Sequence, residues 1–312
     1  MQEWLAALEK ITDEEALPRF RPRFLSFLLA LPLVGLGACS TSDVLNGLTQ
    51  SKAYALSASV PYGDGPRARL DIYAPRQPAC AGKAPVVVFF YGGTWSSGEK
   101  ADYAFVAAAL AARGILTVIP DYRLYPEVSY PDFLVDNARA VAWTRSEIAS
   151  YGGDPRRLFL MGHSAGGYNA AMLALDARWL GRFDMSPTLL RGWIGLAGVY
   201  DFLPIENRQA QPVFHHPDYP PGSQPIDYAD ARSPAAFIGV DDGDRLVNPQ
   251  RNSAQMARRL EQGGVPVQYR SYARLSHTLL IGVFADPLHW LAPVRDDVAD
   301  FILRRADCGS AA

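Results

Sequence analysis

The chain alternates between short apolar runs and longer stretches with helical spacing. Six short runs are rich in apolar, β-branched or aromatic residues, and most of them are almost continuously apolar, which is typical of parallel strands covered on both faces. These runs are Val86–Tyr91, Ile115–Pro120, Arg157–Gly162, Trp193–Ala197, Ala235–Val240 and Val267–Tyr272. Helices are expected near 101–112, 132–149, 165–176, 249–262 and 293–305. The alternation predicts an α/β fold with one mostly parallel sheet of about eight strands and helices on both faces.

Two further segments belong to the same unit. Tyr54–Ser59 and Ala68–Tyr73 are joined by turn residues at 63–65, so we expect an antiparallel hairpin that leads into the sheet. The segment 203–233 is rich in Pro, His, Tyr and Asp and has no clear period. It is predicted to be a loop excursion over one end of the sheet. Residues 54–308 are therefore expected to form one domain.

The N-terminal part of the chain has a different pattern. A basic stretch, 19–23, precedes an apolar run of thirteen residues, 24–36. The run is too short for a membrane span, which needs about 20 residues. A basic stretch, a short apolar core and then small residues are typical of a secretory signal. The following Gly-Ala-Cys-Ser resembles a bacterial lipoprotein box in which Cys39 is the acylated residue.

This pattern leads to an expectation about location. Residues 1–39 would be the signal and lipoprotein-like segment, 40–53 a tether, and the protein would lie in the bacterial cell envelope, lipid-anchored or periplasmic. Residues 1–18 are acidic and helix-like, which is unusual ahead of a signal, so a later start codon is one alternative. The other is a buried N-terminal helix, in which case the protein would be cytoplasmic.

Composition and charge narrow the classes of function. The 312 residues include 30 Lys and Arg and 32 Asp and Glu, which gives a net charge of −2. This argues against nucleic acid as the main partner, because phosphate binding needs an excess of basic residues. Three cysteines without a C-x-x-C motif argue against both a disulfide-dense scaffold and a structural zinc site. His215 and His216 have no third well-spaced ligand, so a surface loop is expected there and not a metal site.

Two cysteines remain if Cys39 is acylated. Cys80 precedes a predicted strand and Cys308 follows the last predicted helix. In an envelope protein such a pair can form a structural disulfide, because that compartment is oxidising. The alternative is two unpaired thiols.

The main chemical motif is Gly162-His163-Ser164-Ala165-Gly166. It follows one predicted strand directly and opens a predicted helix. In such a strand-to-helix turn the serine is held above the sheet in a strained conformation, and side chains at the two glycine positions would collide with neighbouring backbone. The sequence therefore predicts that Ser164 is a nucleophile and that the N–H of Ala165 points to where negative charge develops.

A serine hydroxyl needs a base to become a good nucleophile. In hydrolases with this motif the acid and then the histidine follow the serine along the chain, which leaves His277 and His289 among five histidines. His277 lies in the loop after the predicted strand 267–272 and is predicted to be the base. His289, beside the start of the final helix, is predicted to be structural.

The acid is expected in the loop that follows the predicted strand 235–240. This loop contains Asp241, Asp242 and Asp244, of which Asp242 is predicted to be a solvated turn residue. Asp201, after the preceding strand, is a more distant option. The residues alone leave Asp241 and Asp244 both open.

The pentapeptide Tyr91-Gly92-Gly93-Thr94-Trp95 ends the first strong predicted strand. Its glycines allow close approach of the backbone, so the N–H groups of Gly93 and Thr94 can join that of Ala165 as oxyanion donors. The pentapeptide resembles the His-Gly-Gly-x-Trp oxyanion loop of esterases, with Tyr91 in place of His. That replacement leaves the backbone donors intact but changes how the loop is braced from behind.

Together, these motifs resemble those of α/β-hydrolase carboxylesterases. They most resemble the bifunctional feruloyl/acetyl-xylan-esterase-like group, which is related to hormone-sensitive-lipase-like esterases and kynurenine formamidases. The resemblance covers about residues 54–305 and rests on Tyr91–Trp95, Asp121-Tyr122-Arg123-Leu124, Tyr151-Gly152-Gly153-Asp154-Pro155, the Ser164 motif, Asp244 and His277. Related hydrolases place the acid three residues before a valine that precedes a proline-bearing helix start. Val247 fits that valine, so the resemblance implies Asp244, with Asp241 as the alternative.

The sequence thus predicts a serine hydrolase acting on small-molecule carboxylic esters, with Ser164, His277 and Asp244 as its triad. Trp95 and Tyr168 flank the predicted site and are candidates for lining the substrate pocket. No cofactor or metal is implied. One alternative is the same machinery cleaving an amide, as in an arylformamidase or a peptidase. Another is a non-enzymatic binding protein on a hydrolase scaffold.

Overall fold

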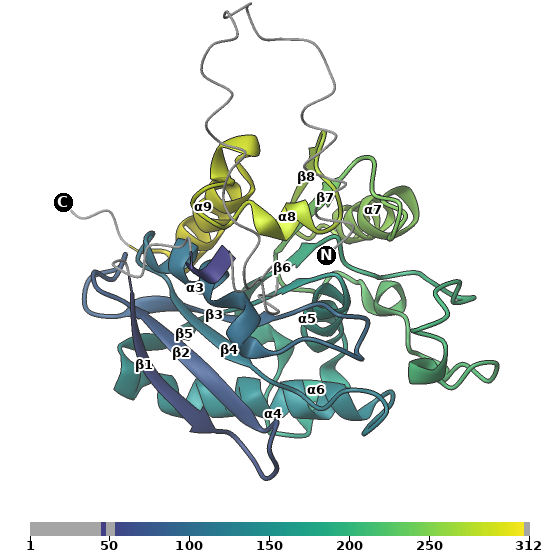
Figure 1. Cartoon of the computed structure of the whole chain (residues 1–312), viewed down its shortest axis with the longest axis horizontal. Helices are drawn as coiled ribbons and strands as arrows, with labels where there is room; N and C mark the ends of the chain where they lie inside the picture. Colours follow the sequence, from purple (N-terminus) through teal and green to yellow (C-terminus); the bar gives the residue numbers. More distant parts are fainter. Residues whose placement is uncertain (1–44, 48–53, 309–312) are drawn as a thin grey trace, which may run out of the picture.

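The computed structural model describes residues 45–47 and 54–308, and its centre is an eight-stranded sheet (Figure 1). The strand order is β1-β2-β4-β3-β5-β6-β7-β8. β2 runs antiparallel to both of its neighbours, whereas the other strand pairs are parallel. The strands are β1 (Tyr54–Pro61), β2 (Arg69–Pro75), β3 (Ala84–Phe90), β4 (Leu116–Pro120), β5 (Gly153–His163), β6 (Leu190–Leu196), β7 (Ala236–Asp241) and β8 (Val267–Tyr272). The predicted hairpin and mostly parallel sheet are confirmed.

Helices cover both faces of this sheet. The α-helices are α3 (Ala104–Ala111), α4 (Asp132–Glu147), α5 (Ala165–Leu175), α6 (Ala177–Gly181), α7 (Gln255–Gln262), α8 (Leu279–Gly282) and α9 (Val294–Ala306). Short 3-10 turns are η2 (Lys100–Tyr103), η3 (Ile148–Tyr151), η4 (Pro187–Leu189), η5 (Pro212–Phe214), η6 (Pro225–Tyr228) and η8 (His289–Leu291), and η7 (Gln250–Ala254) is a π-helical turn. α3 and α9 lie on one face, and α4, α5 and α6 on the other (Figure 1).

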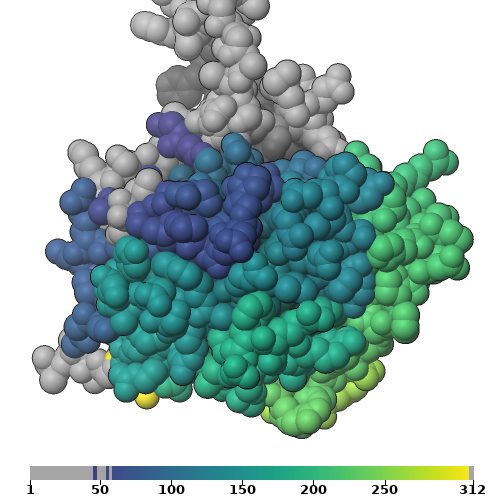
Figure 2. Space-filling model, turned by 90° about the horizontal axis from the view of Figure 1, so that it is seen from below, coloured from purple at the N-terminus to yellow at the C-terminus, as the bar shows by residue number. Residues whose placement is uncertain are grey.

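The hydrophobic pattern explains the order of the layers. Every residue of β3 is buried, because this central strand has helices above and below it. β8, at the edge, has only one buried residue. Val298 and Phe301, at helical spacing, belong to the buried side of α9. The space-filling view shows the hairpin packed directly against the rest of the domain (Figure 2).

The helices differ from the sequence prediction at their ends and in two short additions. The expected helix near 101–112 begins as the 3-10 turn η2, and the one near 249–262 begins as the π-helical turn η7. The short helices α6 and α8 were not predicted, because four or five residues are too few to show a helical period.

The segment 203–233 contains only η5 and η6 as regular structure. It folds back over the carboxyl ends of the strands. Phe214 of η5 packs edge-on against Trp95, with ring centroids 4.9 Å apart. The segment therefore forms part of the wall around the candidate site.

Cys80 and Cys308 form a disulfide, with Cα atoms 4.8 Å apart. Of the two alternatives that the sequence left open, the structure shows the paired one. The bond joins the loop before β3 to the end of α9, across a sequence separation of 228 residues. Cys39 and the predicted signal lie outside the described residues. Within the described ranges, no helix is both long and apolar enough to span a membrane.

Removing this disulfide is expected to lower stability without affecting the site directly. Closing a loop of 228 residues restricts the unfolded chain, so the Cys80→Ser/Cys308→Ser variant should lose up to about 5 kcal/mol of unfolding free energy. Urea denaturation of the oxidised protein and of the variant measures the difference. Equal denaturation midpoints at equal slopes would show that the bond does not stabilise the fold.

Candidate active site

Ser164 lies at the turn from β5 into α5, with φ 55° and ψ −121°. This backbone conformation is unfavourable for a residue with a Cβ atom, so neighbouring packing must hold it. The flanking positions both require glycine. A Cβ at Gly162 would lie 2.0 Å from the carbonyl oxygen of Gly166, and a Cβ at Gly166 would lie 1.9 Å from that of Phe90. The tight turn therefore fixes where the serine side chain emerges.

His277 lies in the loop between β8 and α8, and Asp244 in the loop after β7. Their side chains meet, with His277 Nδ1 2.7 Å from Asp244 Oδ2. The other oxygen of Asp244 accepts hydrogen bonds from the backbone N–H groups of Leu246 and Val247, at 2.8 and 3.0 Å. A carboxylate can only accept, so Nδ1 of His277 carries the hydrogen of this bond.

Two opposing effects act on the pKa of Asp244. Burial of its side chain favours the neutral acid. The hydrogen bonds from His277 and from the backbone at Val247 and Leu246 favour the carboxylate and outweigh burial, so the pKa lies below its usual value. Asp244 is therefore ionised at neutral pH.

Asp241, the alternative acid, has a different partner. It ends β7 and is buried, and its Oδ1 accepts a hydrogen bond from the backbone N–H of Leu275 at 3.1 Å. Burial, together with repulsion from Asp242 and Asp244, raises its pKa to about 6. The structure thus brings Asp244 to His277, whereas Asp241 supports the loop that carries it.

The raised pKa of Asp241 predicts a pH-dependent effect of Asp241→Asn on stability. A group whose pKa is higher in the folded than in the unfolded protein stabilises the fold at low pH, and this stabilisation is lost as the pH rises through about 6. Asparagine cannot ionise but can still accept from Leu275. The free energy of unfolding of the variant, relative to wild type, should therefore increase between pH 4 and pH 7. Urea denaturation across this range measures it, and a constant difference would contradict the assignment.

The loop after β3 faces Ser164 from the other side. Gly93, Thr94 and Trp95 have φ values of 121°, 54° and 54°, so three successive residues turn in the left-handed region. The turn is closed by the backbone N–H groups of Ser96 and Ser97, which donate to the carbonyl oxygen of Gly93 at 3.0 and 3.1 Å. Gly93 and Thr94 line the same cavity as Ser164 and Ala165.

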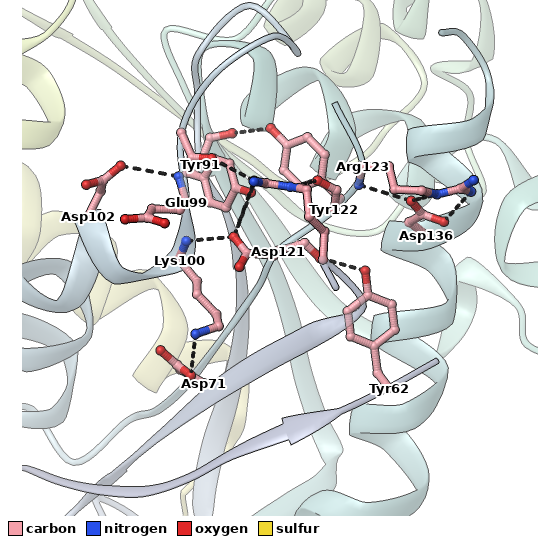
Figure 3. A network of polar contacts seen from close by, with 12 residues as sticks. Tyr62, Asp71, Tyr91, Glu99, Lys100, Asp102, Asp121, Tyr122, Arg123 and Asp136 are labelled. Atoms are coloured by element: carbon pink, nitrogen blue, oxygen red, sulfur yellow. Dashed lines mark hydrogen bonds and ion pairs between the residues drawn. The ribbon is translucent and has the colours of Figure 1, made fainter. Parts of the chain in front are cut away.

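Tyr91, where related loops have histidine, is itself buried and is held by a partly buried polar network (Figure 3). Its hydroxyl donates to Asp121 Oδ1 at 2.9 Å and accepts from Arg67 Nη2 at 2.8 Å. Tyr122 donates to the carbonyl oxygen of Tyr91 at 2.9 Å, and the N–H of Lys100 donates to the same Asp121 oxygen at 2.8 Å. Burial raises the pKa of Tyr91, so it stays neutral. The network braces the loop from behind.

The cavity over Ser164 has a volume of about 400 Å3. Ser164 and His277 both line it. Its apolar wall is formed mainly by side chains from the loops after β3, β6 and β7, namely Trp95, Val199, Phe202, Ile205, Leu246 and Val247. Asp201, Glu206 and Arg251 add charge to the lining, and Arg251 pairs with Asp201 at 3.2 Å. Sequence reasoning did not identify these three as pocket residues.

Of the two aromatic candidates for the pocket, only Trp95 lines it. Its indole N–H donates to Asn169 Oδ1 at 3.0 Å. Tyr168 is a correction: it is fully buried behind Trp95, its ring edge-on at 5.1 Å, and its hydroxyl donates to the carbonyl oxygen of Ser223 at 2.9 Å. One turn into α5, its side chain is covered by the returning segment 203–233.

The remaining histidines outside the Ser164 motif have local partners. His289 is exposed, with Nδ1 2.6 Å from the carbonyl oxygen of Asp286. His215 Nε2 lies 2.8 Å from the carbonyl oxygen of Tyr130. Across the described part of the chain, no group of three or more His, Cys, Asp or Glu side chains could hold a metal ion.

Comparison with known sequences identifies relatives. The family model BD-FAE matches residues 70–260. A probable isoprenylcysteine alpha-carbonyl methylesterase from Oryza sativa subsp. japonica is 39% identical over 48% of this chain and 36% of its own length. The probable carboxylic ester hydrolase LipM from Mycobacterium tuberculosis is 30% identical over 78% of this chain and 61% of its own length. The matched region thus spans less than two thirds of either relative.

Solved structures share the fold. A truncated carbohydrate esterase from gut microbiota superposes with a TM-score of 0.71 at 21% identity, over 83% of this chain and 99% of that one. An esterase from Pyrobaculum calidifontis gives 0.68 at 22% identity, over 85% and 90%. The sheet, the strained serine turn and the family match agree with the resemblance seen in the sequence. The chain therefore belongs to the BD-FAE family and has the α/β-hydrolase fold.

Proposed function

We propose that this protein is a serine hydrolase that cleaves carboxylic esters through an acyl-enzyme. The observation that carries the proposal is the hydrogen bond from His277 to the buried Asp244, with His277 lining the same cavity as Ser164. Relatives named as methylesterases and carboxylic ester hydrolases favour esters over amides. A binding protein would have no need for a strained serine beside a histidine–carboxylate pair.

The geometry supports a specific sequence of steps. Ser164 Oγ attacks the ester carbonyl while His277 Nε2 takes its proton. The ionised Asp244 stabilises the resulting imidazolium. Collapse of the tetrahedral intermediate breaks the bond to the leaving oxygen, which receives the proton from His277. Water then attacks the acyl-enzyme, again with His277 as base, and releases the acid and free Ser164.

Backbone N–H groups would stabilise the oxyanion in both steps. Ala165 opens α5, so its N–H belongs to the first turn of a helix, where backbone donors are unpaired. Gly93 and Thr94 approach from the opposite loop. The polar network around Tyr91 keeps that loop in place before substrate arrives, so little reorganisation is needed during the reaction.

The test combines a probe with a substrate comparison. A fluorophosphonate should label wild-type protein at Ser164, and p-nitrophenyl acetate should be hydrolysed faster than an N-formyl aryl amide. The reverse preference would favour an arylformamidase-type or peptidase-type amide hydrolase. Absence of both labelling and turnover would favour a non-enzymatic binding protein. A series of p-nitrophenyl esters of increasing chain length would then define the acyl group that the cavity accepts.

We also propose that the protein is anchored in the bacterial envelope through acylated Cys39. The disulfide between Cys80 and Cys308 supports this location, because such bonds persist in oxidising compartments. Replacing Cys39 by alanine should abolish incorporation of radiolabelled palmitate and release the enzyme from membranes, with unchanged esterase activity. Continued lipid labelling of the variant would remove Cys39 as the anchor.

A further inference from the structure

A second hollow, also of about 400 Å3, lies at the opposite end of the strands from the candidate active site. Leu190 and Arg191, the first residues of β6, line it together with Ala235 and Pro266, which directly precede β7 and β8. The site residues instead follow the carboxyl ends of β5, β7 and β8. Because these strands are parallel, one hollow opens at their amino ends and the other at their carboxyl ends.

The lining of this hollow is strongly basic. Four arginines contribute, Arg145 from α4, Arg156 from β5, Arg191 from β6 and Arg305 from α9. The other lining residues carry no charge, namely Thr188, Leu189, Leu190, Ala235 and Pro266. This concentration of positive charge occurs in a chain whose net charge is −2. We call this hollow the arginine groove.

Among the described residues, most of this charge has no carboxylate partner. Arg145 Nη1 donates to the carbonyl oxygen of Pro155 at 2.6 Å, and Arg191 Nε to that of Arg156 at 3.3 Å. Arg156 pairs with Asp154 at 3.3 Å. In residues 54–308, it is the only one of the four that forms an ion pair with a carboxylate. Carbonyl oxygens orient the guanidinium groups but leave their charge.

We propose that the arginine groove binds a multiply charged anion of the phosphate type. Like charges placed around one hollow repel each other, and an anion between them removes that repulsion. One guanidinium group can donate two parallel N–H hydrogen bonds to two oxygens of a phosphate, which makes arginine well suited to bind phosphate groups. A single carboxylate would leave most of the charge unmatched. The phosphate groups could belong to a soluble molecule or to a lipid headgroup.

Pyrophosphate is a suitable probe. At constant ionic strength it should bind wild-type protein by calorimetry and raise the thermal midpoint more than chloride does. The Arg191→Gln/Arg305→Gln variant should bind it at least about tenfold more weakly, because two charge-assisted contacts are lost. Arg258→Gln, an exposed arginine on α7, is the matched control and should bind like wild type. Esterase activity should be the same in all three proteins.

Two outcomes would overturn the site: no effect of pyrophosphate beyond that of chloride, or equal affinity of the double variant and wild type. A second arm distinguishes the sources of phosphate. Co-sedimentation with phosphatidylglycerol vesicles that is competed by pyrophosphate would identify a lipid headgroup. Binding of pyrophosphate without binding of vesicles would identify a soluble ligand.

An independent observation concerns His163, which directly precedes Ser164. Its side chain is buried, and Nε2 lies 2.9 Å from the backbone carbonyl oxygen of His277, with the two rings 4.9 Å apart. A carbonyl only accepts, so Nε2 of His163 is the donor. Burial and the neighbouring His277 lower the pKa of His163 to about 3, so the ring is neutral at physiological pH.

We infer that His163 is a positioning residue that sets the backbone of His277 relative to Ser164. The inference rests on the proposed function. Asp244 fixes the ring of His277 through Nδ1, whereas His163 ties the loop of His277 to the same tight turn that carries Ser164. A displacement of about 1 Å between reacting groups can cost on the order of 10²-fold in rate. One bond at this point can therefore control the alignment of nucleophile and base.

Two substitutions test this role. His163→Leu removes the donor and should lower kcat for p-nitrophenyl acetate by roughly 10- to 100-fold, with KM nearly unchanged. His163→Gln keeps an N–H donor and should recover most of that loss, provided thermal denaturation shows both variants folded. Equal kcat in wild type and His163→Leu, or no recovery in His163→Gln, would overturn the inference. Failure of the proposed function is distinct, because wild type itself would then neither turn over ester nor react with fluorophosphonate.

Discussion

Ser164→Ala is expected to lower kcat for ester hydrolysis by a factor of about 10⁴ or more while leaving the fold intact. In the proposed mechanism the hydroxyl of Ser164 is the protein group that forms a covalent bond with the acyl carbon. Alanine fits the same turn, because the φ of 55° is already tolerated by a residue with a Cβ atom. The residual rate would come from binding and the oxyanion donors alone.

The measurement is the initial rate with p-nitrophenyl acetate, together with fluorophosphonate labelling. Thermal denaturation provides the control, because the midpoint should stay close to that of wild type. Ser97→Ala is a matched substitution in the neighbouring loop, where the hydroxyl lies 3.1 Å from the carbonyl oxygen of Gly93. It should leave fluorophosphonate labelling in place. Activity of Ser164→Ala within tenfold of wild type would refute the assignment of the nucleophile.

The sheet could be predicted because its central strands are buried on both faces. β3 is an uninterrupted apolar run and β4 is interrupted only by Thr117, and both strands contain only buried residues. β5 begins at Gly153, earlier than the predicted start at Arg157. The sequence did not predict this first part of the strand because its residues are mostly polar. Hydrogen-bond pairing with β3, and not hydrophobicity, extends that strand, and such pairing is not visible in one local run of sequence.

The site was predictable where local geometry determines it. Gly162 is required by a contact within the turn, with the carbonyl oxygen of Gly166, so the motif alone indicates that conformation. Gly166 is required by the carbonyl oxygen of Phe90, because the turn lies directly against the end of β3. The bracing of Tyr91 could not be derived in this way. Arg67 and Asp121 are 24 and 30 residues from it, and only the arrangement of the strands brings the three together. The same holds for Tyr168, whose burial depends on how 203–233 returns over α5.

The choice of the acid also depended on the fold. Asp241 and Asp244 are only three residues apart, so the sequence places both of them near the same end of β7. The charge of either residue could serve His277. The structure separates them by what each oxygen accepts: Asp241 takes the N–H of Leu275, and Asp244 takes His277. The resemblance to related hydrolases implied Asp244 through its spacing from Val247. The structure gives a physical reason for this spacing, since the N–H of Val247 is one of the donors to the Asp244 carboxylate.

Asp244→Asn is expected to reduce kcat on the order of 10⁴-fold, and Asp241→Asn much less. The carboxylate of Asp244 accepts three hydrogen bonds, from the backbone N–H groups of Leu246 and Val247 and from His277 Nδ1. An amide has one oxygen, and that oxygen is best used by the two backbone donors. Its NH2 group then faces Nδ1 of His277 and donates to it. The hydrogen of the ring moves to Nε2, which can no longer take the proton of Ser164.

Asp241→Asn is the matched control, because the same isosteric change is made three residues away and its oxygen can still accept from Leu275. Both variants should show cooperative unfolding, and their kcat values with p-nitrophenyl acetate are compared at the same pH. A greater loss in Asp241→Asn than in Asp244→Asn would transfer the role of the acid to Asp241. The predicted ranking follows from the partner that each amide can no longer serve. At Asp244 the NH2 group replaces the oxygen that accepts from His277 Nδ1, whereas at Asp241 the amide oxygen can still accept from Leu275.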